Sequence, residues 1–127
     1  MTPNLIWITN DLNEAIIAAE SFCQTGCRVL IITQNEDLLE EFNAEWNLNN
    51  SRTLLTVRSS DPLNSAAKTY IDWLYNPQSA ELLITEKSLR KVYQEQVPPG
   101  YSYTTIPIAG TNSIFFDLAV VKLLDKP

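Results

Sequence analysis

The segment Arg28-Val29-Leu30-Ile31-Ile32-Thr33 decides the fold class of this 127-residue chain. It is an almost unbroken run of branched apolar residues, which is typical of a strand covered on both faces in a parallel sheet. Gly26 precedes it at a position typical of a helix end, and Asn35 follows it as a helix cap. A helix, a buried strand and a second helix in this order predict an α/β protein.

The same alternation continues along the whole chain. Four further segments have the composition of strands: 5–9, 53–57, 81–85 and 103–108. Segments with helical periodicity lie between and after them: 11–26, 35–46, 61–74, 86–96 and 112–124. We therefore expect one domain, residues 1–127, with the three-layer α/β/α architecture of a Rossmann-like sandwich and a five-stranded, mainly parallel sheet.

Single residues predict finer features of the sheet. The strands 5–9, 28–33 and 81–85 are apolar enough to be covered on both faces. Pro107 places the strand 103–108 at an edge, because proline cannot donate to a neighbouring strand. Asp61 and Pro62 predict the start of the third helix, with Asp61 as its cap. The strand order stays open between 3-2-1-4-5 and 2-1-3-4-5.

The charge of the chain argues against two classes of partner. Its formal net charge is −6, whereas nucleic acids and anionic membranes favour a basic surface. The one tight basic cluster, Lys87, Arg90 and Lys91, is interpreted as a solvated helix face. We find no signal-peptide pattern and no apolar run long enough for a membrane helix, so we expect a cytoplasmic protein.

The residue types for metal binding and nucleophilic catalysis are scarce. The chain has no histidine and two cysteines, Cys23 and Cys27, which do not suffice for a structural zinc site. We predict that both thiols are free and buried. No nucleophile has a partner base of the usual kind, so we predict no catalytic residue, no metal and no cofactor.

The turn after the first strand, Asn10 to Asn13, lies where a dinucleotide-binding protein has its glycine-rich phosphate loop, and it contains no glycine. Ligands of open α/β sheets bind beyond the carboxyl ends of the strands, at the topological switch point. Asp11 and Glu86 have the oxygen atoms to share a divalent cation there, or each simply begins a helix. The residues predicted to bind any ligand are Asn10, Asp11, Asn13, Thr85, Glu86 and Lys87.

The segment 112–124 is more apolar than a helix needs in order to cover one face of a sheet. As a helix it would leave one apolar flank exposed, and such patches often mark association surfaces. The residues predicted to form this interface are Phe115, Phe116, Val120 and Leu124. The alternative is that the segment is core, or a further strand.

Residues 4–63 resemble the N-terminal part of the short-chain dehydrogenase/reductase family. Gly26 to Ile32 is similar to that family's second strand, Asn35 to Glu41 to the following helix, and Ser60-Asp61-Pro62 to the loop after its third strand. The resemblance implies a Rossmann fold. The family's glycine-rich first turn and its Tyr-x-x-x-Lys catalytic pair have no counterpart here, so the resemblance does not extend to dehydrogenase activity.

Residues 80–110 are similar to the small Rossmann-like rotor subunit of V-type ATPases. The similarity lies in Leu83-Ile84-Thr85-Glu86, the charged helix after it, and Thr105-Ile106-Pro107. It implies a small domain that docks on a partner through a C-terminal helix. A receiver domain also has five units and acids near Asp11 and Asp61, but the lysine that receivers have after the fifth strand is missing.

The sequence therefore predicts a non-catalytic Rossmann-like binding or assembly module. It would act through protein–protein contacts, as a homodimer or with another protein, by way of its apolar C-terminal segment. Two alternatives stay open: a small nucleotide- or dinucleotide-binding protein of degenerate short-chain dehydrogenase type, and a rotor component like that of V-type ATPases. A small-molecule ligand at the crevice is also left open.

Overall fold

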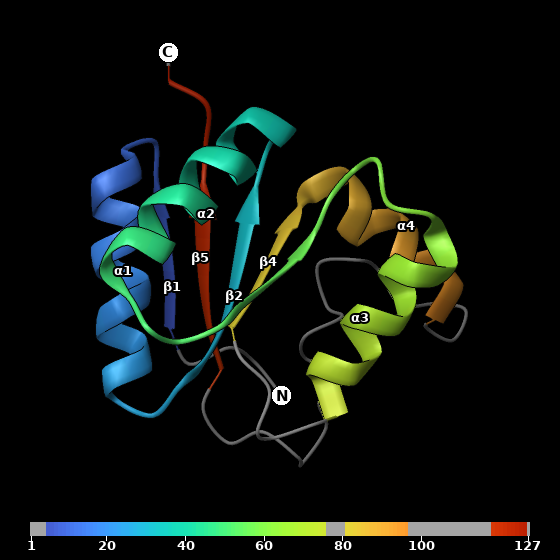
Figure 1. The fold of residues 1–127 in the computed structure, drawn as a ribbon, viewed down its shortest axis with the longest axis horizontal. Coiled ribbons are helices and arrows are strands. Elements are labelled where there is room, and N and C mark those ends of the chain that lie inside the picture. Colours follow the sequence, from blue (N-terminus) through green and yellow to red (C-terminus); the bar gives the residue numbers. More distant parts are fainter. Residues whose placement is uncertain (1–4, 76–80, 97–117, 127) are drawn as a thin grey trace.

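The computed structural model describes residues 5–75, 81–96 and 118–126 (Figure 1). These residues form a five-stranded sheet in which every pair of neighbouring strands is parallel, in the order β1-β5-β2-β4-β3. The elements, in chain order, are β1 (Leu5–Thr9), α1 (Leu12–Gln24), β2 (Arg28–Thr33), α2 (Glu36–Asn49), β3 (Leu54–Val57), α3 (Leu63–Tyr75), β4 (Glu81–Thr85), α4 (Glu86–Gln96) and β5 (Leu118–Leu123).

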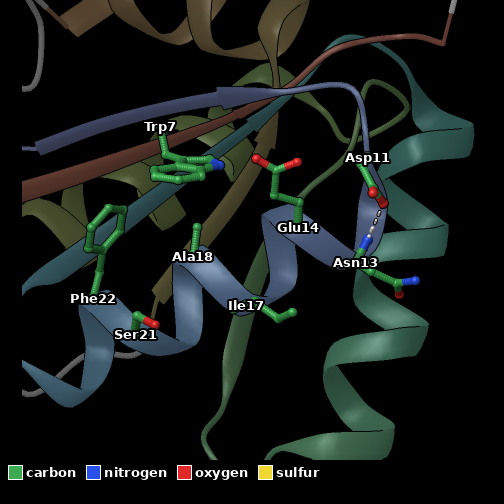
Figure 2. Close-up of a pocket in the computed structure, with 8 residues that line it drawn as sticks. All are labelled: Trp7, Asp11, Asn13, Glu14, Ile17, Ala18, Ser21 and Phe22. Atoms are coloured by element: carbon green, nitrogen blue, oxygen red, sulfur yellow. Dashed lines mark hydrogen bonds between the residues drawn. The ribbon is translucent and has the colours of Figure 1, made fainter.

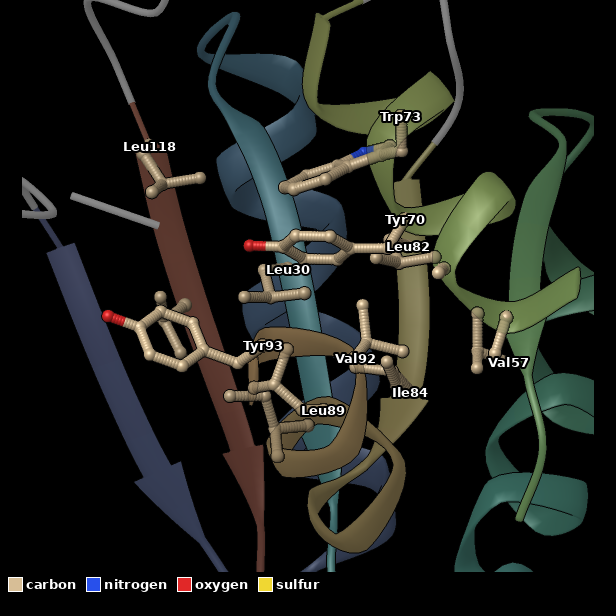
Figure 3. Packing of buried hydrophobic residues seen from close by; sticks show 14 residues of the cluster. Leu30, Val57, Tyr70, Trp73, Leu82, Ile84, Leu89, Val92, Tyr93 and Leu118 are labelled. Atoms are coloured by element: carbon tan, nitrogen blue, oxygen red, sulfur yellow. The ribbon is translucent and has the colours of Figure 1, made fainter. Parts of the chain in front are cut away.

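Helices cover both faces of the sheet, and the side chains of the central strands alternate between them. Val29 and Ile31 pack against α1 and α2, whereas Leu30 and Ile32 of the same strand pack against α3 and α4. Figure 3 shows the second of these layers, where Tyr70 and Trp73 of α3 lie over the sheet and Tyr93 of α4 reaches toward β5. The predicted three-layer α/β/α architecture is confirmed.

The chain crosses the sheet twice. From β1 to β3 it moves in one direction, with α1 and α2 on one face, and from β3 to β5 it moves back, with α3 and α4 on the other face. Right-handed crossovers require this change of face when the direction reverses. The chain therefore leaves the neighbouring strands β2 and β4 toward opposite faces, and the topological switch point lies between their carboxyl ends.

This topology corrects several predictions. Neither predicted strand order is right, because β5 lies between β1 and β2. Residues 118–123 are a central strand, so a helix over 112–124 is wrong for this part, and the alternative of a further strand is right there. The predicted strand 103–108 lies outside the described residues. All six residues of β5 are in the core or nearly so, and its apolar pattern therefore carries no period that separates a strand from a helix.

The starts of the helices follow the predicted capping with one exception. Asp11 caps α1 by accepting from the N–H of Asn13 over 3.0 Å, and Asn35 caps α2 by accepting from Leu38 over 2.9 Å. The carboxylate of Asp61 instead accepts from the backbone N–H of Arg58, closing the turn before α3. Asp61 is thus a turn residue and not the cap of the third helix.

Candidate functional site

The polar residues predicted to share one crevice divide into two groups that lie far apart. Asn10, Asp11 and Asn13 follow β1 at the edge of the sheet, whereas Glu86 and Lys87 follow β4 at the switch point. Two strands, β5 and β2, separate β1 from β4, which corresponds to roughly 14 Å at the usual strand spacing. A cation shared by Asp11 and Glu86 is therefore wrong. The described residues also contain no cluster of three His, Cys, Asp or Glu side chains suited to a metal.

Thr85 is engaged in the structure of the helix start. Its side chain is buried, its Oγ1 accepts from the backbone N–H of Ser88 over 3.2 Å and donates to Ser88 Oγ over 2.7 Å. This is the bonding of a helix cap, here for α4. Thr85 thus stabilises the start of α4 beside the switch point and does not line a hollow there.

The switch point itself holds a basic hollow of about 380 Å³. Glu86 and Arg90, one turn apart on α4, form an ion pair of 3.1 Å at its margin. With Lys87 and Lys91, the lining has three cationic side chains and one carboxylate, although the net charge of the chain is −6. The lining residues are Gln34, Glu86, Lys87, Arg90, Lys91 and Gln94.

Two hydrogen bonds join the segments that follow β2 and β5 beside this hollow. Asn35 Nδ2 donates to the carboxylate of Asp125 over 2.5 Å, and the backbone N–H of Asp125 donates to Gln34 Oε1 over 3.1 Å. The residues after β2 and after β5 are thereby held together at the carboxyl end of the sheet. Asn35 does this while it also caps α2.

The backbone of β1 presents a second candidate site, along the open edge of the sheet. The carbonyl of Thr9 faces β5, because it accepts from the N–H of Leu124 over 2.8 Å. The N–H and C=O of one strand residue point to the same side, and the side alternates from residue to residue. Trp7 and Thr9 therefore bond to β5, while the N–H and C=O groups of Ile6 and Ile8 point away from the sheet. No strand of the described chain lies on that side.

The side chains of β1 are apolar and exposed. Ile6 and Ile8 are 58% and 59% exposed, and their pairing with Val120 and Lys122 places them on the α3/α4 face. Trp7, 43% exposed, lies on the opposite face. The prediction that this strand is covered on both faces is wrong: β1 is an exposed edge strand.

An apolar hollow of about 340 Å³ lies beside Trp7, between β1 and the outer side of α1 (Figure 2). Ile17, 61% exposed, and Phe22 form part of its wall. Asp11 and Asn13, two of the predicted ligand residues, line its polar end. They therefore lie at this apolar hollow and not at the switch point. The lining residues are Trp7, Asp11, Asn13, Glu14, Ile17, Ala18, Ser21 and Phe22.

The predicted interface on the C-terminal segment is not formed as expected. Val120 is buried in β5, between β1 and β2, and cannot lie on a surface. Leu124 follows β5 and is half-buried. Phe115 and Phe116 lie outside the described residues. Sequence reasoning missed Ile6 and Ile8, because a strand without a charge or a proline is typical of an inner position, and only the topology places it at the edge.

The amino end of the sheet holds a charged cluster that is structural. The carboxylate of Glu81, 2% exposed, accepts from Nε and Nη2 of Arg52 over 3.1 and 2.6 Å. Arg28 lies over the Trp73 ring at 4.8 Å and donates to the Trp73 carbonyl. Burial lowers the pKa of Arg28 to about 10, which leaves it charged at neutral pH.

Both thiols are free, as predicted; Cys27 is buried as expected, whereas Cys23 is only half-buried. Burial, followed by the charge of Glu81 and a hydrogen bond to it, raises the pKa of the Cys23 thiol from 9.0 to about 12. Because the thiolate is the nucleophilic form, Cys23 is inert at neutral pH.

No protein-family model, curated protein or solved structure matches this chain. The resemblances to short-chain dehydrogenases and to the V-type ATPase rotor therefore stay predictions. In the part of the chain that the structure describes, none of the helices has the length and apolar character needed to span a membrane.

Proposed function

We propose that this chain is a non-catalytic Rossmann-like assembly module that binds protein at the β1 edge of its sheet. The observation that carries the proposal is the mismatch between the composition of β1 and its position. Leu5-Ile6-Trp7-Ile8-Thr9 has the apolar composition of an inner strand, yet among the described residues it forms an edge, and no described strand bonds to its outward backbone groups. A partner strand would supply the neighbour that such a composition suits.

The surroundings of β1 favour a protein partner over a small ligand. Apolar side chains are exposed on both faces of the strand, with Ile6 and Ile8 on one and Trp7 and Ile17 on the other. A small molecule in the hollow beside Trp7 would cover only one face. An added strand would cover both faces and would bond to the open N–H and C=O groups between them.

A lysine-flanked peptide tests whether the β1 edge accepts an added strand of apolar sequence. The peptide carries the β1 sequence with Phe in place of Trp, so that the protein alone contributes tryptophan fluorescence. Trp46 and Trp73 are fully buried, and Trp7 is the tryptophan that acrylamide can reach. We expect the peptide to reduce acrylamide quenching of Trp7, since an added strand covers that side chain.

The control is the same peptide N-methylated at the two positions that would bond to Ile6 and Ile8. It keeps the charge and the side chains but cannot donate to the edge. The proposal is wrong if the unmethylated peptide leaves the quenching unchanged, or if both peptides reduce it equally.

A second candidate function is the binding of a small anionic ligand at the switch point. The observation that favours it is the hollow between β2 and β4, where Lys87, Arg90 and Lys91 outnumber Glu86 on an otherwise acidic chain. On this proposal, the nucleotide-binding alternative belongs at β4 and not at the glycine-free turn after β1, which lies at the edge of the sheet and away from the switch point. Inorganic pyrophosphate is the probe for this candidate.

A further inference from the structure

We infer that the strand added to β1 belongs to a second copy of this chain, paired antiparallel with Trp7 on a two-fold axis. The inference rests on the proposed function and names its partner. Identical edges that meet around a two-fold axis perpendicular to the sheet must run antiparallel, and each residue then contacts its symmetry mate or the residue that mirrors it. The five residues of β1 have Trp7 at their centre.

The backbone pattern of β1 fits this pairing. With Trp7 on the axis, Ile6 of one copy lies opposite Ile8 of the other. Both residues point their N–H and C=O groups to the open edge, as fixed by the bond from Leu124 to Thr9. Each of the two Ile6–Ile8 pairs therefore exchanges two hydrogen bonds, and the Trp7 pair falls at a site without hydrogen bonds, where facing side chains approach most closely.

The side chains are complementary in the same arrangement. Ile6 meets Ile8 of the second copy on one face, and the two Trp7 rings meet on the other. On that second face α1 packs on β1, β5 and β2, so it is centred over β5. The two α1 helices would then stand roughly 14 Å apart, three strand spacings, which leaves room for the Trp7 and Ile17 side chains of both copies.

Charge placement also permits two copies, although each has a net charge of −6. The acids near this surface, Asp11 and Glu14, lie at the carboxyl end of β1 and the start of α1. Antiparallel pairing sets that end beside the opposite end of the second copy's α1, where Ser21 and Phe22 stand. The acids of the two copies are therefore kept apart.

Sedimentation equilibrium of the full chain tests the inference. We expect a reversible dimer with a dissociation constant on the order of 10 μM, since a five-residue edge is smaller than a standard interface. Ile17→Glu should raise that constant at least 30-fold, because it puts two carboxylates beside the axis. Leu48→Glu is the matched control: Leu48 is 78% exposed on α2, away from β1, and its substitution should leave the dimer unchanged.

Oxidative cross-linking tests the register. Trp7→Cys places two thiols across the axis at a pair without hydrogen bonds, within the span of a disulfide, whereas Ile6→Cys places them diagonally and out of reach. A covalent dimer of Trp7→Cys only supports the inference; one of Ile6→Cys only overturns it. A monomer at 1 mM wild-type chain overturns the homodimer, and if the β1 peptide still protects Trp7, the proposed edge binding stands without it.

Discussion

The backbone N–H of Leu124 donates to the carbonyl oxygen of Thr9 over 2.8 Å, and this bond fixes the direction of the backbone groups along β1. Through it, Trp7 and Thr9 belong to the β1–β5 ladder, and Ile6 and Ile8 to the open edge. The difference is invisible in composition, since Ile6, Trp7 and Ile8 are all apolar and all exposed. Substitutions at the two kinds of backbone position should therefore differ in their effect on stability.

Proline should separate the two kinds of position. Trp7→Pro removes a donor of the β1–β5 ladder, and we expect it to lower the free energy of unfolding by about 3 kcal/mol or more. Ile8→Pro removes an outward N–H, and we expect a loss of only about 1 kcal/mol in the monomer. Urea unfolding of both variants at low protein concentration makes the comparison, and equal losses would contradict the deduced direction of the backbone groups.

Removal of Arg52 should destabilise the fold. Glu81 is 2% exposed, and Arg52→Ala leaves its carboxylate buried without its bidentate partner. Because the Arg52 side chain is itself 54% exposed, water can replace part of its contact with Glu81, and we expect a loss of about 2 kcal/mol in the free energy of unfolding. Arg58→Ala, which breaks the more exposed pair with Glu40, should cost less than about 1 kcal/mol. Thermal unfolding of the two variants checks the order, and the reverse order would refute the structural role of Glu81.

Asn35 and Asp125 should be coupled. Asn35→Asp keeps an oxygen for the α2 cap but turns the donor toward Asp125 into a second carboxylate. We expect this variant to lose about 1 kcal/mol, although aspartate is as good a cap as asparagine. Adding Asp125→Asn returns a donor to the pair and should recover most of the loss. A double-mutant cycle at neutral pH measures the coupling, and simple additivity of the two changes would contradict the contact.

The Cys23 thiol should remain protonated in alkaline solution. Its folded-state pKa of about 12 lies above the ordinary 9.0, so the unfolded chain loses this proton first. The contribution of Cys23 to stability is therefore complete below pH 9 and is lost as the pH rises toward 12. In a Cys27→Ser background, the rate of alkylation of Cys23 should rise about tenfold per pH unit between the two pKa values, without a plateau. A plateau near pH 9 would show an unperturbed thiol.

Pyrophosphate binding at the switch point should depend on Lys87. Lys87→Glu reverses an exposed charge beside the basic hollow. This substitution should raise the dissociation constant of pyrophosphate about tenfold, which is about 1.4 kcal/mol. Lys68→Glu, on an exposed part of α3, is the control and should have little effect. Isothermal titration at two salt concentrations provides the measurement. An equal effect of both substitutions would mean attraction by overall charge and not a site.

Local signals in the sequence predicted most of the elements. The strands up to residue 85, the four helices and the caps Asp11 and Asn35 follow from short-range patterns of apolar and capping residues. The strand at residues 118–123 did not follow from such patterns, because β5 is covered on both faces and its apolar run has no readable period.

Strand order was beyond the reach of the sequence, since it depends on which strands meet across the sheet. That order separated Asp11 from Glu86 and assigned them to different hollows. It also turned β1 from an expected inner strand into an edge. The apolar residues of β1 indicate core by composition, and only the topology shows that they face outward in a single copy.

Hydrogen exchange at four consecutive amides of β1 tests the central proposal most directly. In a dilute sample, the amides of Ile6 and Ile8 should exchange rapidly and those of Trp7 and Thr9 slowly, because only the latter two bond to β5. At concentrations well above the dimer dissociation constant, all four should exchange slowly, since an added strand satisfies the outward pair. If Ile6 and Ile8 exchange at the unprotected rate at both concentrations, no second copy pairs with β1.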